Sequence, residues 1–114
     1  MSDDSLNLLQ GTLDVLVLKA LIRGPQHGYA VARWIRETTD GTLEVEEGAL
    51  YTALHRLEKR KWLRAEWGEA DSGRQAKFYA LTAAGRKQLA EEESDWERLS
   101  TAIALIMRTT EKAD

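Results

Sequence analysis

The sequence predicts a mainly α-helical domain that carries one small β-hairpin and ends in a long helix. Three observations support this fold class. Apolar residues recur with the helical period of 3.6 before Leu63, alternate with period 2 between residues 63 and 81, and return to helical spacing from residue 83 onward. A chain of 114 residues with 43% hydrophobic residues suits one domain with a modest core.

The first expected helix runs from Leu6 to Arg23 and is apolar around nearly its whole circumference. A helix of this kind is buried on two sides. In a small domain one of those sides belongs to a second subunit, and we predict that Leu9, Leu13 and Leu16 contribute to that interface. Gly24-Pro25 ends the helix.

The second expected helix covers Gln26 to Thr39, in which Val31 and Ile35 share one face. The segment that follows has turn composition, and residues 43–45 alternate as a short strand would. This connection is longer than the three- to four-residue turn of the simplest helix-turn-helix. An elaborated form of that motif is therefore expected.

The third expected helix spans Gly48 to Leu63 and has a basic outer face. Its core stripe is formed by Leu50, Leu54 and Leu57, at positions i, i+4 and i+7. The side chains expected to point outward are those of Tyr51, Thr52, His55, Arg56 and Lys59. Their hydroxyl, imidazole and cationic groups can donate hydrogen bonds to phosphates and base edges. The alternative is an ordinary solvated helix face, with Tyr51 packed on the core.

Residues 63–81 are expected to form a hairpin with a long polar tip. Apolar and charged residues alternate from Leu63 to Trp67, and the tip, residues 68–75, carries two glycines. We interpret Trp67 as a strand-packing residue. Arg74 and Lys77 lie near the tip, where a strand pair can reach a phosphate or the minor groove.

The last expected helix begins after Thr82, a good N-cap, and extends from Ala83 to about Arg108. Its apolar residues form an interrupted heptad stripe, with steps of 7, 3, 4 and 3: Leu89, Trp96, Leu99, Ile103 and Ile106. Such a helix is about 39 Å long at 1.5 Å per residue, which exceeds what the domain's own core needs. We therefore predict that Trp96, Leu99, Ile103 and Ile106 pack against a partner chain, and that residues 109–114 are frayed.

Positive charge is concentrated in the middle of the chain, although the net charge is −3. Residues 48–90 contain nine Lys or Arg against four Asp or Glu, whereas both flanking segments are acidic. The field that a nucleic acid experiences is local, because salt screens charges over roughly 8–10 Å. The distribution is therefore compatible with binding to DNA.

Composition argues against several other classes of protein. The chain has no cysteine and only two histidines, and it shows no nucleophile motif, glycine-rich phosphate loop or metal-ligand spacing. We therefore expect no enzymatic activity, no metal and no cofactor. The first residues contain neither a signal peptide nor a membrane span, which favours a cytoplasmic protein without a membrane partner.

Three helices, the third with a basic face, followed by a hairpin with basic residues near its tip, describe a winged helix-turn-helix. We predict a DNA-binding domain over residues 1–81, a dimerisation helix over residues 82–108 and a tail over residues 109–114. Two copies at a fixed spacing would supply the specificity that one recognition helix lacks. The alternative function is a winged-helix module that binds an acidic protein and ignores DNA.

Several motifs together resemble the PadR family of bacterial transcriptional regulators, in its short form with one C-terminal helix. They are Gly11-Thr12-Leu13-Asp14, His27-Gly28-Tyr29, the segment from Glu47 to Glu58, Gly73-Arg74-Gln75-Ala76-Lys77-Phe78-Tyr79 and Leu81-Thr82-Ala83-Ala84-Gly85. The resemblance implies a homodimeric regulator, most often a repressor, that binds double-stranded DNA at an inverted repeat and is released by an effector.

Carried over by position, the resemblance places Tyr51, His55 and Arg56 toward DNA, with Arg74 and Lys77 of the wing toward phosphate or minor groove. It also implies that Trp96 lines a pore between subunits that takes a flat hydrophobic effector, although Trp96 in the dimer core is the alternative. This chain departs from the family where Thr52 replaces a usual proline and Lys61 a usual glycine. Both replacements are expected to suit a helix better.

Overall fold

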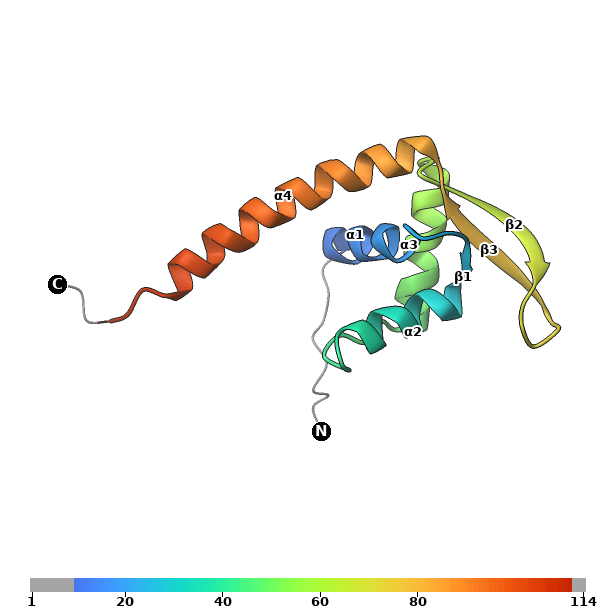
Figure 1. Ribbon diagram of the computed structural model, residues 1–114, viewed down its shortest axis with the longest axis horizontal. Helices are drawn as coiled ribbons and strands as arrows, with labels where there is room; N and C mark the ends of the chain where they lie inside the picture. Colours follow the sequence, from blue (N-terminus) through green and yellow to red (C-terminus); the bar gives the residue numbers. More distant parts are fainter. Residues whose placement is uncertain (1–9, 112–114) are drawn as a thin grey trace.

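The computed structural model describes residues 10–111, in which three helices pack beside a small antiparallel sheet and a fourth extends away from them (Figure 1). In chain order the elements are α1 Gln10–Ala20, β1 Gln26–His27, α2 Gly28–Thr38, α3 Glu47–Lys59, β2 Leu63–Glu69, β3 Gln75–Leu81 and α4 Ala83–Met107. Helices α1 to α3 pack together, and the β2–β3 hairpin projects from them (Figure 1). The predicted fold class, mainly α with a small hairpin, is confirmed.

One hydrophobic core joins α1, α2, α3 and the base of the hairpin. The predicted stripe on α3 lies at its centre, because Leu50, Leu54 and Leu57 are each at most 1% exposed. Val17, Leu18 and Leu21 complete the core from the side of α1. Burial of this stripe fixes which face of α3 is left outward.

The sheet contains a strand that the sequence did not suggest. β1 pairs antiparallel with β3, which gives the order β1-β3-β2. The expectation that the second helix begins at Gln26 was wrong, because His27 is extended and its Nδ1 accepts a hydrogen bond from the Ala30 N–H at 3.2 Å. His27 is thus the N-cap of α2, and residues 26–27 remain free to pair with β3.

Two other boundaries differ from expectation. The first helix ends at Ala20 rather than Arg23, because residues 21–23 form a turn. The expected beginning of that helix, residues 6–9, lies outside the described residues. No strand forms at residues 43–45, where Leu43 is an isolated bridge residue and residues 44–45 have no regular structure.

The predicted hairpin is confirmed. β2 and β3 pair from Leu63↔Leu81 to Glu69↔Gln75. The tip is closed by the N–H of Ala70, which donates to the carbonyl of Arg74 at 2.8 Å, and Gly73 has a φ of +85° that favours glycine. The interpretation of Trp67 as a packed residue was wrong, because its side chain extends beyond the core and is 68% exposed.

The turn after α3 is a Schellman motif centred on Lys61. The N–H of Trp62 donates to the carbonyl of Leu57, and the N–H of Lys61 donates to that of Glu58. Lys61 has a φ of +66°, the left-handed conformation in which a Cβ is strained. The expectation that lysine suits this position better than glycine was therefore wrong, since residue 61 lies beyond the end of the helix.

Lys61→Gly is expected to increase the free energy of unfolding by about 1 kcal/mol, because glycine removes the left-handed strain and part of that gain is offset by its freer unfolded state. Urea denaturation measures the change. Lys59→Gly is the matched control, since residue 59 is within α3 and should lose about 1 kcal/mol. Equal destabilisation by both substitutions would contradict the prediction.

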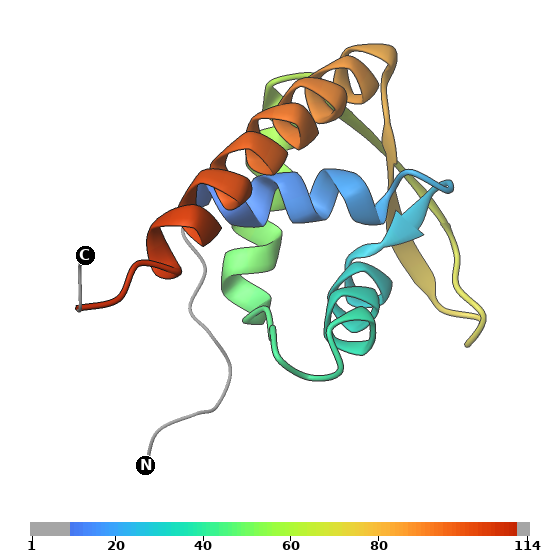
Figure 2. The same cartoon turned by 60° about the vertical axis from the view of Figure 1, so that its left-hand side comes forward.

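The predicted N-cap of α4 is confirmed. The Oγ1 of Thr82 accepts a hydrogen bond from the Gly85 N–H at 3.0 Å and donates one to the carbonyl of Lys61 at 2.7 Å. Leu89 is buried in the core at 1% exposure. Farther along, α4 leaves the body, and its C-terminal half continues past α1 (Figure 1 and Figure 2).

Candidate nucleic-acid interface

The outward face of α3 is polar and accessible along its length. Thr52, His55 and Lys59 are exposed, as predicted. Tyr51 is only half-buried: its ring lies over Gly28 of α2, where an added Cβ would fall 2.7 Å from the phenol oxygen. Gly28 thus provides the space for the phenol end of the Tyr51 ring, whose centroid lies 6.5 Å from that of His55.

Arg56 does not point outward, so this part of the prediction was wrong. Its Nη2 lies 2.5 Å from Oδ1 of Asp14 and its Nε lies 3.3 Å from Oδ2, and the Arg56 side chain is only 21% exposed. The physical reason is the carboxylate of Asp14, which the helical period of α1 places near the core. Arg56 faces α1 and satisfies that charge instead of lying on the exposed face of α3.

The two basic residues of the wing have different surroundings. Arg74 is exposed in the tip of the hairpin. Lys77 pairs across the strands with Trp67, and its Nζ lies 3.6 Å from Oε1 of Glu58 and 5.7 Å from the centre of the Tyr79 ring. Lys77 therefore leans toward α3, and its charge is partly balanced.

Tyr79 belongs to the core rather than to the interface. It is 1% exposed, and burial raises its pKa above the ordinary value of 10.0, with Glu58 and Tyr51 acting in the same direction. The phenol therefore stays neutral at any pH below that value. Its ring supports Lys77 from beneath.

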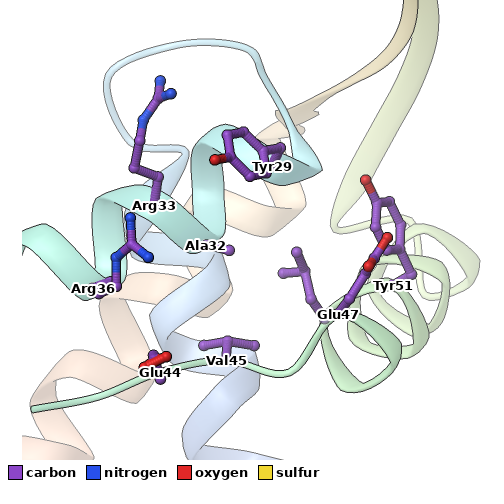
Figure 3. A pocket seen from close by; sticks show the side chains of 9 residues that line it. Tyr29, Ala32, Arg33, Arg36, Glu44, Val45, Glu47 and Tyr51 are labelled. Carbon is purple, nitrogen blue, oxygen red and sulfur yellow. The ribbon is translucent and has the colours of Figure 1, made fainter. Parts of the chain in front are cut away.

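A pocket of about 250 Å³ lies between α2 and α3, beside the exposed face of α3 (Figure 3). Tyr29, Arg33 and Arg36 of α2 form one side of it. Tyr29 is 64% exposed, and the guanidinium carbon of Arg33 lies 5.5 Å from its ring centre. Sequence reasoning missed these residues, although Tyr29 and Arg33 are four residues apart and such spacing places two side chains together on a helix.

Trp96 lies in a second hollow, of about 360 Å³, between α1 and α4. Gly11, Thr12 and Val15 line it from α1, and Glu92, Asp95 and Leu99 from α4. Trp96 is 51% exposed, so the single chain does not enclose it. The lining of the hollow thus combines an aromatic surface with two carboxylates.

The predicted interface residues fall into three groups. Leu99, Ile103 and Ile106 are 52%, 43% and 64% exposed and are available to a partner. Leu13 is 5% exposed and belongs to the chain's own core, so its assignment to an interface was wrong; Leu16 is partly buried against that core. Leu9 lies outside the described residues.

Residues 10–111 contain neither a membrane-spanning helix nor a cluster of metal ligands. No helix in this range is long and apolar enough to cross a membrane. Nor do any three of its His, Asp or Glu side chains come together as metal ligands would.

Comparison with known proteins identifies the family. Residues 17–91 match the model of the transcriptional regulator PadR-like family. The chain belongs to the PadR-like family. This family comprises DNA-binding transcriptional regulators rather than enzymes, so the PadR-like chain is a DNA-binding transcriptional regulator, as the sequence predicted.

Solved structures similar to this PadR-like chain agree with the assignment. A PadR family transcriptional regulator from Eggerthella lenta is 33% identical, with a TM-score of 0.71 over 89% of this chain and 86% of that one. A transcriptional regulator from Clostridium thermocellum is 30% identical, with a TM-score of 0.75 over 83% and 89%. A protein from Streptococcus mutans is 25% identical, with a TM-score of 0.80 over 96% and 98%.

Proposed function

We propose that the protein is a cytoplasmic homodimeric repressor that binds an inverted-repeat operator. Residues 1–81 form the DNA-binding part and residues 82–108 the dimerisation helix. Each chain supplies one α3 to the major groove and one wing to the flanking phosphates or minor groove. The observation that carries the proposal is the exposed polar face of α3, which includes the cation of Lys59, beside an exposed wing tip with Arg74.

The proposed DNA contacts come from three elements. On α3 they are Thr52, His55 and Lys59, together with the phenol of Tyr51; on the wing they are Arg74 and, at its base, Lys77. Tyr29 and Arg33 extend the surface along α2, the helix that crosses the backbone in helix-turn-helix proteins. Both are exposed and in contact with each other.

Dimerisation is supported by the apolar surface of α4. Trp96, Leu99, Ile103 and Ile106 are all at least 43% exposed in the single chain. An apolar stripe of this extent is typical of a protein interface, and a second copy is the occupant that an inverted repeat requires. Met107 continues the apolar surface at the end of the helix, whereas Leu105 is exposed on another side of α4.

The hollow around Trp96 supports a flat hydrophobic compound as the effector. A flat hydrophobic compound would stack on the indole, and closure by a second α4 would enclose it. We propose that such a compound binds there and thereby causes the protein to dissociate from its operator. The indole packed in the dimer core, without a ligand, is the alternative.

A salt titration of binding to duplex DNA tests the DNA-binding role. The logarithm of the binding constant should fall steeply with the logarithm of salt concentration, because each phosphate contact releases counterions. Lys59→Gln should reduce that slope by about 1, the loss of one phosphate contact. Fluorescence anisotropy of a labelled duplex provides the measurement.

Arg98→Gln is the control for net charge, since Arg98 lies on α4 with its side chain 83% exposed. It should leave the slope unchanged. A wild-type protein that does not bind duplex at low salt would favour the alternative function, a winged-helix module that binds another protein.

A further inference from the structure

Asp14 is the one buried charged residue in residues 10–111, at 6% exposure. It lies on α1, whose other inward residues are apolar. A buried carboxylate is costly unless it is paired and hydrogen-bonded. Among the residues that the structure describes, the compensation comes from the guanidinium of Arg56, which is 42 residues away in the sequence.

The pairing is side-on, with Nη2 on one carboxylate oxygen and Nε on the other. Two parallel contacts of this kind set an angle as well as a distance. The core leucines of α3 fix which face of the helix is buried. The Asp14–Arg56 pair adds a directional contact between α3 and α1, which restrains the angle of α3 on α1.

We infer that Asp14 is a positioning residue for DNA binding, acting through Arg56 on the orientation of α3. The inference rests on the proposed role of α3 as the element that reads DNA. A change in the angle of α3 would move His55 and Lys59 relative to the groove that they are proposed to contact, while the leucine stripe stays buried. Asp14 itself lies on another helix and is buried, so it touches no DNA.

The sign of the expected effect separates this role from simple electrostatics. Removing a negative charge from a protein that binds a polyanion should strengthen binding if charge alone matters. If Asp14 positions α3, its neutral variant should weaken binding instead. For Arg56 both explanations predict weaker binding, so the salt slope decides: it should stay unchanged, because no phosphate contact is removed.

The experiment uses the full chain and a duplex recovered from a random-sequence library by selection on the wild-type protein. Asp14→Asn should raise the Kd by about tenfold, within the range of coupling between paired residues. Arg56→Gln should raise it similarly while leaving the salt slope unchanged, whereas a phosphate contact would lower the slope by about 1. The double variant should bind no worse than either single variant, because both act through one pair.

Glu93→Gln is the matched control, since it breaks the exposed pair between Lys19 of α1 and Glu93 of α4 and removes the same charge. It should bind as well as wild type or slightly more tightly. If Asp14→Asn folds poorly, Arg56→Lys keeps the charge and one contact, and an intermediate loss of affinity at an unchanged slope is expected.

Two results would overturn the inference: Asp14→Asn binding as tightly as Glu93→Gln, or a slope reduced by about 1 in Arg56→Gln. Failure of the wild-type protein to select any duplex would instead count against the proposed function.

Discussion

Ile103→Asp is expected to convert the proposed dimer into monomers and to weaken operator binding by at least about 100-fold, the advantage of two linked contacts over one. Ile103 lies on the apolar stripe of α4 between Leu99 and Ile106, and it is 43% exposed in the single chain. A two-fold interface would bury two such carboxylates, each without a cationic partner, at a cost of several kcal/mol. Light scattering gives the mass, and anisotropy gives the affinity for the selected duplex.

Ser94→Asp is the control for this substitution, because it adds the same charge to the same helix. Residue 94 lies nine positions before residue 103, on about the opposite side of α4 at 100° per residue, and its side chain is exposed. Ser94→Asp should remain dimeric. An intact dimer in Ile103→Asp would refute the assignment of the stripe to the interface, and Leu99→Asp would show whether the seam is elsewhere.

Gly85→Ala is expected to destabilise the fold by about 3 kcal/mol, the upper part of the range for overpacking a core. A Cβ at residue 85 would fall 2.0 Å from the carbonyl oxygen of Trp62. That oxygen is backbone, and it also accepts the N–H of Thr82 at 3.0 Å, so it cannot move aside without breaking the start of α4. Urea denaturation followed by far-UV circular dichroism measures the loss.

Gly11→Ala is the matched control within a helix. A Cβ at residue 11 would meet nothing within 4 Å, so alanine should stabilise the protein by about 0.5–1 kcal/mol. Wild-type stability in Gly85→Ala would mean that α4 does not approach the turn after α3 as closely as the structure shows.

The helical and hairpin periods made most of the fold predictable. The stripe Leu50, Leu54, Leu57 fixed the inward face of α3, and alternation located both arms of the wing. What failed were features that depend on partners distant in sequence. β1 has two residues, too few for any period, and forms because β3 offers it hydrogen bonds.

The interface was predicted less completely for the same reason. Helical spacing places Arg56 off the core stripe, but only α1 supplies the carboxylate that draws it inward. Spacing likewise gave no reason to associate Tyr29 and Arg33 of α2 with α3, since the long connection hides their proximity. The expectation for Lys61 was wrong for a local reason. Helix propensity does not apply to this residue, because it lies beyond the end of the helix and its φ is positive.

The exposed apolar surface of α4 also affects how operator occupancy would depend on the concentration of this regulator. If two chains must dimerise before they bind an operator, the occupancy of the operator rises with the square of the monomer concentration while most copies are monomeric. A modest change in synthesis or degradation then produces a sharper transcriptional response than a monomeric repressor could give. The affinity of the exposed side chains from Trp96 to Met107 for a second copy would thus set the protein concentration at which transcription changes, as well as the steepness of that change.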